Sequence, residues 1–146
     1  MNISDKNKLS GLIDKTIDIL EEYIEETKPL AEEDFNKLEC YLDNRNALMQ
    51  KLRGIYAEEK QVISAQDDKD ILSEIFMLKK LDESYSGDTA ELARKLRAEK
   101  ILYDRIESIE KLVDERFSEA REMLDKDFAQ LNKTKQVIDY MEQTAK

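Results

Sequence analysis

The stretch "FNKLECYLDNRNALMQKLRGIY", residues 35–56, decides the fold because its apolar side chains recur in steps of three and four. The repeating positions are Phe35, Leu38, Leu42, Arg45, Met49, Leu52 and Tyr56. This spacing places all of them on one face of a helix. Arg45 is the one permanent cation on that face. The stretch therefore predicts a long amphipathic helix with a charge inside its apolar side.

The same periodicity continues upstream, across the only proline of the chain. Its apolar and small positions are Ile13, Ile17, Leu20, Ile24, Thr27 and Ala31. A proline either bends or breaks a helix, but the apolar positions keep their phase across Pro29. We therefore favour a single bent helix from about Ser4 to Ile63, about 90 Å long. The alternative is two helices joined at Thr27 to Pro29, with the proline in the first turn of the second.

The rest of the chain predicts one short helix and one long helix. "SAQDDKD", residues 64–70, offers capping side chains before a short apolar segment. The short helix should end at "ESYSGDTAE", residues 83–91, where Gly87 suits a left-handed cap. Asp88 with Glu91 has the spacing of a capping box for the last helix. The apolar positions of that helix are Leu92, Leu96, Leu102, Ile106, Ile109, Val113, Phe117, Ala120, Leu124, Phe128, Leu131, Ile138 and Met141.

These elements predict an all-α fold: an antiparallel bundle of two long helices, the first bent or split at Pro29, plus one short helix. We expect residues 1–146 to form one domain. Segment 126–146 should dock weakly, because Asn132 to Lys135 interrupt its apolar face. The residues expected in the core are Leu38, Leu42, Leu52, Ile106, Ile109, Val113 and Phe117.

Composition favours a cytoplasmic helical protein. Charged and hydrophobic residues each make up 40% of the chain, which contains only three glycines and one proline. The single cysteine, Cys40, cannot form an internal disulfide, and the N-terminus has no apolar run like that of a signal peptide. No stretch has the length of uncharged apolar sequence that crosses a bilayer, so we expect no membrane insertion.

The charge distribution argues against a nucleic-acid partner. The formal net charge is −10, and residues 14–43 hold eleven acids but only three bases. Such a surface repels a phosphate backbone. The cations between Arg94 and Arg105 alternate with acids at helical spacing, which is typical of a solvated helix face.

Catalytic patterns are scarce. The chain has no histidine, which excludes the usual zinc sites and histidine-based triads, and it has no glycine-rich phosphate loop. We therefore expect no catalytic residue, no metal and no cofactor. "LRAEKILYDRIESIEKLVDERF", residues 96–117, superficially resembles the first helix of all-helical chorismate mutases, with Arg45, Arg105 and Arg116 as candidate cations. The spacing does not fit, because the position that should hold the second cation, counted from Arg97, is Asp114.

A different resemblance covers about half of the chain. The run from Asp34 to Ile55 resembles the first long helices of the flagellar type III export chaperones of the FlgN and FliT type. "ILYDRIESI", residues 101–109, is similar to a pattern in their later helix. "LNKTKQVIDYM", residues 131–141, resembles their lysine-containing tail with its aromatic residue, here Tyr140.

The resemblance implies a cytoplasmic chaperone that binds an amphipathic helical segment of a hook-associated or filament-cap protein and prevents its premature assembly. The C-terminal region would also contact the export apparatus. On this reading the client-binding residues are Arg45, Met49, Phe128, Leu131, Ile138, Tyr140 and Met141.

The sequence leaves two questions open, namely the environment of Arg45 and the function of the protein. Arg45 either pairs with an acid on a facing helix, and so fixes their register, or lies at the mouth of a groove that receives a client. The apolar stripes also suit a structural or adaptor coiled coil that homo-oligomerises, with a homodimer as its simplest form. A chorismate-mutase-like helical enzyme is the least favoured reading.

Overall fold

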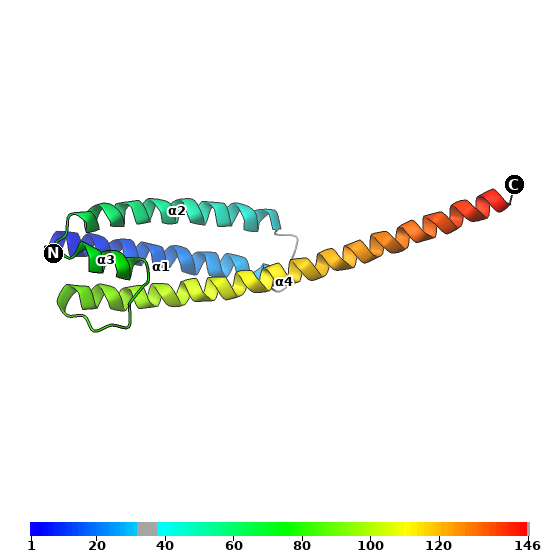
Figure 1. Cartoon of the computed structure of the whole chain (residues 1–146). Coiled ribbons are helices and arrows are strands. Elements are labelled where there is room, and N and C mark those ends of the chain that lie inside the picture. The colour runs from blue at the N-terminus through cyan, green and yellow to red at the C-terminus, as the bar shows by residue number, and fades with distance from the viewer. Residues whose placement is uncertain (32–37, 146) are drawn as a thin grey trace. The chain divides into compact units, whose positions relative to one another are not determined.

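The computed structural model describes the backbone of residues 1–31 and 38–145 and the side chains of residues 1–30 and 41–145, in four α-helices (Figure 1). They are α1 (Ile3–Ala31), α2 (Leu38–Ser64), α3 (Lys69–Phe76) and α4 (Gly87–Thr144). The described residues contain no strand. The predicted all-α fold is therefore confirmed.

The chain divides into two compact units. Unit 1 is Met1–Glu110 and unit 2 is Lys111–Lys146, so α4 contributes to both. Unit 1 contains α1, α2, α3 and the first part of α4, whereas unit 2 is the remainder of α4. The weak docking expected for segment 126–146 stays a prediction.

The chain reverses direction between α1 and α2, which pack side by side (Figure 1). The prediction of a single bent helix from Ser4 to Ile63 is therefore wrong. Pro29 lies inside α1, which ends two residues later at Ala31, so the proline is not in the first turn of α2 either. The common phase of the apolar positions does not require one continuous helix, because each helix buries an apolar side of its own.

The core of unit 1 is built by all of its helices. Its buried cluster consists of Leu9, Ile13, Val62, Ile63, Leu72, Ile75, Phe76, Leu81, Leu92 and Leu96. Three of these belong to α3, which is short but supplies Leu72, Ile75 and Phe76. The short helix thus covers one end of the bundle, as the sequence predicts.

Ion pairs and hydrogen bonds join α1 to α4 around this core. The ammonium group of Lys95 lies 2.6 Å from the Ser10 hydroxyl and 2.9 Å from a carboxylate oxygen of Asp14. Lys6 pairs with Asp88 at 3.1 Å and also with Glu91. The predicted capping box of Asp88 and Glu91 is wrong, because α4 begins one residue earlier, at Gly87, and both carboxylates bind α1 instead.

The segment between α3 and α4 contains unusual backbone conformations. Leu78 and Lys80 have φ angles of 60° and 55°, a left-handed region that bulky residues rarely adopt. Gly87 has φ of 60°, as predicted, but it begins α4 and does not cap the short helix, which ends at Phe76 with Met77 as its C-cap. Arg97 Nε and Nη2 donate hydrogen bonds of 2.9 and 2.6 Å to the carbonyl oxygen of Leu81, which holds this segment on α4.

The predicted core residues fall into three groups. Ile106 and Val113 are buried, as expected, whereas Leu42 is 49% exposed, so its placement in the core is wrong. Leu52, Ile109 and Phe117 are half-buried. The side chain of Leu38 lies outside the described residues.

Leu42 is exposed because the buried side of α2 is rotated from the stripe read in the sequence. Tyr41 and Leu48 are buried on this helix, while Leu42 and Met49, each one residue later, are exposed. One residue corresponds to about 100° around a helix. The quoted stripe therefore runs along the edge of the buried side, and Arg45 lies on that edge too.

Candidate functional site

Arg45 forms an ion pair with an acid on another helix. Its Nε atom lies 3.4 Å from Oε1 of Glu110 on α4, and its side chain is 49% exposed. The same carboxylate oxygen accepts a hydrogen bond of 2.6 Å from the hydroxyl of Tyr23 on α1. The sequence alternative in which Arg45 pairs with an acid on a facing helix is thus confirmed. A role for Arg45 in client binding stays a prediction.

The Tyr23–Glu110–Arg45 contact joins three helices at one point. Burial raises the pKa of the Tyr23 hydroxyl, and the hydrogen bond to Glu110 raises it further, so the phenol stays protonated and donates. Glu110 thereby receives one neutral donor and one cation. A shift of any one of α1, α2 and α4 along its axis would break one of these contacts, so both contacts are specific to the observed register.

The edge of α2 beside Arg45 carries exposed apolar side chains. Leu42, Met49 and Tyr56 recur every seven residues and are 49%, 44% and 47% exposed. Met49 is therefore accessible, as a client-binding residue must be. Seven residues make almost two helical turns, so the three side chains lie on one side of α2.

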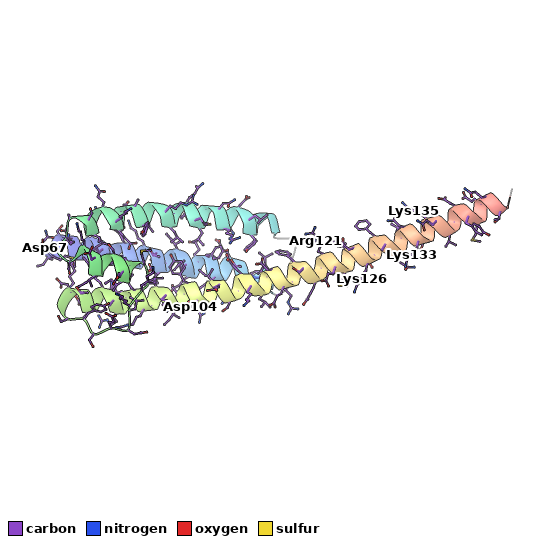
Figure 2. The ribbon with its side chains drawn as sticks, in the orientation of Figure 1. Asp67, Asp104, Arg121, Lys126, Lys133 and Lys135 are labelled. Atoms are coloured by element: carbon purple, nitrogen blue, oxygen red, sulfur yellow. The ribbon has the colours of Figure 1, made fainter. Side chains whose placement is uncertain are left out.

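Unit 2 exposes more apolar surface than α2 does. Its described large apolar residues that are at least 49% exposed are Met123 (67%), Leu124 (56%), Phe128 (61%), Leu131 (49%), Val137 (57%), Ile138 (49%), Tyr140 (67%) and Met141 (62%). Figure 2 shows the charged side chains of Arg121, Lys126, Lys133 and Lys135 standing along the same part of α4. Five of the seven predicted client-binding residues belong to this exposed set.

Helix geometry sorts these residues into two sides. At about 100° per residue, Leu124, Phe128, Leu131 and Ile138 fall within about 80° of one another, and we call them the C-terminal face. Met123 and Met141 lie at its edge by the same count. Val137 and Tyr140 fall on the other side of the helix. Tyr140 is therefore exposed but does not share a side with Leu131 and Ile138.

The seven predicted residues do not form a single described site. Arg45 and Met49 belong to unit 1, and Phe128, Leu131, Ile138, Tyr140 and Met141 belong to unit 2. Each group is accessible in its own unit. Among the arginines of the enzyme alternative, Arg105 is exposed, and Arg116 lies in unit 2, where its Nη1 is 3.6 Å from Glu119.

Sequence reasoning missed a pair of buried acids, Glu59 on α2 and Glu99 on α4. They are only 6% and 4% exposed, and both line one pocket of about 140 Å³. Burial raises the pKa of Glu59 to about 8, with a contribution from the nearby charge of Glu99, whose own pKa is raised to about 7 by burial. The sequence did contain a signal for this pair, because each acid stands where the helical repeat predicts an apolar residue. Glu59 lies between Ile55 and Val62, and Glu99 lies between Leu96 and Leu102.

Two absences apply to the part of the chain that the structure describes. Within it, no three acidic or thiol side chains gather where they could hold a metal ion. None of its helices combines the length and the apolar character of a bilayer-spanning segment. Comparison of the chain with protein-family models, curated proteins and solved structures gives no match.

Proposed function

We propose that this protein binds an amphipathic helical segment of a partner protein through the C-terminal face of unit 2. The observation that carries the proposal is the exposure of Leu124, Phe128, Leu131 and Ile138, each at least 49% accessible on one side of a helix. Lys135 lies on the same side and separates Ile138 from the other three residues. Soluble proteins seldom expose several neighbouring large apolar side chains unless these contact something. A second helix buries such side chains most completely, because its own side chains repeat at the same spacing.

The charge of the two units supports binding through unit 2. Residues 1–110 hold 26 acids and 17 bases, a net charge of −9. Residues 111–146 hold eight acids and seven bases, a net charge of −1. Unit 2, with nearly balanced charges, repels an acidic partner much less than unit 1 does, so burial of apolar area can drive binding to unit 2.

The resemblance to FlgN and FliT type proteins gives the finer form of the proposal. The protein would be a cytoplasmic flagellar export chaperone, and its client would be a hook-associated or filament-cap protein. Covering the client's amphipathic helix would prevent premature assembly, and the same tail, including Tyr140, would meet the export apparatus. This step rests on the sequence resemblance, while the binding surface rests on unit 2.

Binding to candidate clients tests the proposal directly. Hook-associated and filament-cap proteins from the same genome are titrated with the wild-type chain and with Leu131→Ala by calorimetry. Burying the remaining exposed part of a leucine contributes about 1 kcal/mol, so Leu131→Ala should weaken binding about five- to ten-fold.

Val137 provides the matched control, because it is 57% exposed but lies outside the C-terminal face. Val137→Ala should leave the affinity unchanged. Equal losses for both variants would contradict a specific face. If no candidate client binds the wild-type chain, the chaperone form of the proposal fails, although another amphipathic partner would still test the surface.

A second candidate function, a homo-oligomeric structural or adaptor coiled coil, is favoured by one observation. Leu124, Leu131 and Ile138 recur every seven residues, which is the repeat of a left-handed coiled coil. Phe128 continues this seam four residues after Leu124, but Lys135 occupies the equivalent position after Leu131 and disfavours a symmetric pair. Light scattering across a hundred-fold range of concentration distinguishes the two: a dimer that Leu131→Asp dissociates favours the coiled coil.

A further inference from the structure

The pocket around Glu59 and Glu99 lies where the elements of unit 1 meet. Thr16 comes from α1, Leu52, Tyr56 and Glu59 from α2, Phe76 from α3, Met77 and Leu78 from the segment after it, and Glu99 and Tyr103 from α4. Thr16 is 3% exposed and the two carboxyl groups are scarcely more accessible. The pocket thus has two acids, three hydroxyl groups and otherwise apolar walls.

No cation accompanies these acids among the described residues that line the pocket. The Thr16 hydroxyl donates its hydrogen to the carbonyl oxygen of Leu12 at 3.0 Å and is also within hydrogen-bonding reach of Glu99. Glu59, more than nine-tenths buried, has no hydrogen bond or ion pair to any described residue. A buried carboxyl group without a partner is costly, and a positive charge beside it removes that cost.

The walls indicate which kind of cation fits. A hard metal ion such as Ca²⁺ takes six to eight oxygen ligands. Among the described residues only two carboxyl groups line this pocket, and most of the other lining side chains are apolar. An organic cation uses both parts of the site, because its alkyl chain contacts Leu52, Phe76 and Met77. Its charge meets the two carboxylates, and its N–H groups meet the hydroxyl oxygens that line the same pocket.

The volume limits the size of the ligand. A protein cavity of about 150 Å³ holds benzene, which has six non-hydrogen atoms. The pocket of about 140 Å³ therefore accommodates a four-carbon alkylammonium ion, which has five. This is the end group of a lysine side chain and also of a small free amine.

We propose that this pocket binds a primary alkylammonium group, with Glu59 and Glu99 as its two carboxylate partners. Binding fills the apolar part of the pocket with the alkyl chain and places the ammonium group between the acids. Three N–H donors are available to the two carboxylates and a neighbouring hydroxyl oxygen. Any proton that the carboxyl groups hold leaves to solvent when the cation binds.

Thermal unfolding of the full chain tests this inference, with n-butylammonium chloride as the probe and sodium chloride at equal ionic strength as the reference. At ten times its Kd, the probe should raise Tm by about 4 °C or more. Glu59→Gln and Glu99→Gln keep the shape of each side chain but remove the charge, and they should abolish the rise. Glu58→Gln is the matched control, because Glu58 neighbours Glu59 but is exposed.

The result that would overturn the inference is an equal rise in Tm for wild type and for both pocket variants. A rise with calcium chloride but not with butylammonium would assign the pocket to a metal ion and would also overturn it. Should a glutamine variant fail to fold, calorimetry of the wild type in two buffers of different ionisation enthalpy decides. Both carboxyl groups are mostly protonated at pH 6.5, so binding with release of between one and two protons supports the site, and binding without proton release contradicts it.

The source of the alkylammonium group is a separate question that the same assay answers. A lysine whose backbone amine and carboxyl groups are both blocked represents a lysine of a partner protein, and butylammonium represents a free amine. Either probe, if it binds and loses its effect in Glu59→Gln, supports the site. The ratio of their two Kd values tells which source the pocket prefers.

Discussion

Replacing Glu59 by glutamine should stabilise the protein at neutral pH. The folded state raises the pKa of this carboxyl group from 4.5 to about 8, so the folded state binds more protons than the unfolded state at every pH between these values. Stability therefore falls as pH rises through this range. At pH 7 the penalty of the raised pKa is about 3 kcal/mol for Glu59 alone.

Glutamine removes that penalty but leaves an amide that must find its own hydrogen bonds, at a cost of about 1 kcal/mol. We therefore expect Glu59→Gln to raise the free energy of unfolding at pH 7 by about 2 kcal/mol. Between pH 5 and pH 7, ionisation of Glu59 should lower the free energy of unfolding of the wild-type protein by about 2 to 3 kcal/mol. In the variant, the free energy of unfolding should fall only by the part that Glu99 contributes.

Urea denaturation followed by circular dichroism at pH 5, 6, 7 and 8 measures both quantities. The chain suits this experiment because it has no histidine, the residue that ordinarily titrates in this range. Glu58→Gln, an exposed neighbour, should reproduce the wild-type slope. A wild-type stability that is constant or rises between pH 5 and 8, or a Glu59→Gln variant with an unchanged slope, would refute the reasoning.

Three further predictions concern the core, the ion pair and the tail. Leu96→Ala should lower the free energy of unfolding, measured by urea titration, by about 2 to 5 kcal/mol, because Leu96 is 0% exposed. Leu124→Ala is the control: Leu124 is 56% exposed, so its replacement should change the free energy of unfolding by less than about 1 kcal/mol. Arg45→Met should leave the helix content intact and change the free energy of unfolding by less than about 1 kcal/mol, because the Arg45 side chain that pairs with Glu110 is half exposed. If urea denaturation shows that the free energy of unfolding falls by more than about 2 kcal/mol, the pair is required for folding. Deletion of residues 132–146 should leave a folded bundle, because every described side chain there is exposed; an unfolded circular dichroism spectrum would contradict this.

The positions of the apolar residues were readable from the sequence, but the rotation of α2 was not. Steps of three and four in residues 35–56 correctly predict a helix over the part that the structure describes. They do not distinguish Leu42 from Tyr41, because an amphipathic helix with apolar residues on nearly half its circumference can turn by one residue and still face a core. Packing against α1 accompanies the burial of Tyr41 and Leu48.

The hairpin between α1 and α2 was also beyond the sequence pattern. Pro29 is compatible with a bend, a break or the last turn of a helix, and the phase of the apolar positions is the same in all three cases. The outcome depends on whether the free energy gained by packing α1 against α2 exceeds that of one continuous helix. That free energy comes from tertiary contacts, which a local pattern does not contain. The candidate binding residues divide in the same way: the sequence identified Phe128, Leu131 and Ile138 as apolar and periodic, and the structure determined that they are exposed.

By itself the sequence determined the helical class, the presence of one short helix and the presence of a cation within the apolar stripe of residues 35–56. These follow from local properties, namely propensity, periodicity and the scarcity of glycine and proline. Only the tertiary structure decided that Arg45 meets Glu110, that the chain reverses after α1, and that Glu59 and Glu99 share one pocket. Such features join residues far apart in the chain, and their free energies depend on distance and burial in three dimensions, which no local pattern encodes.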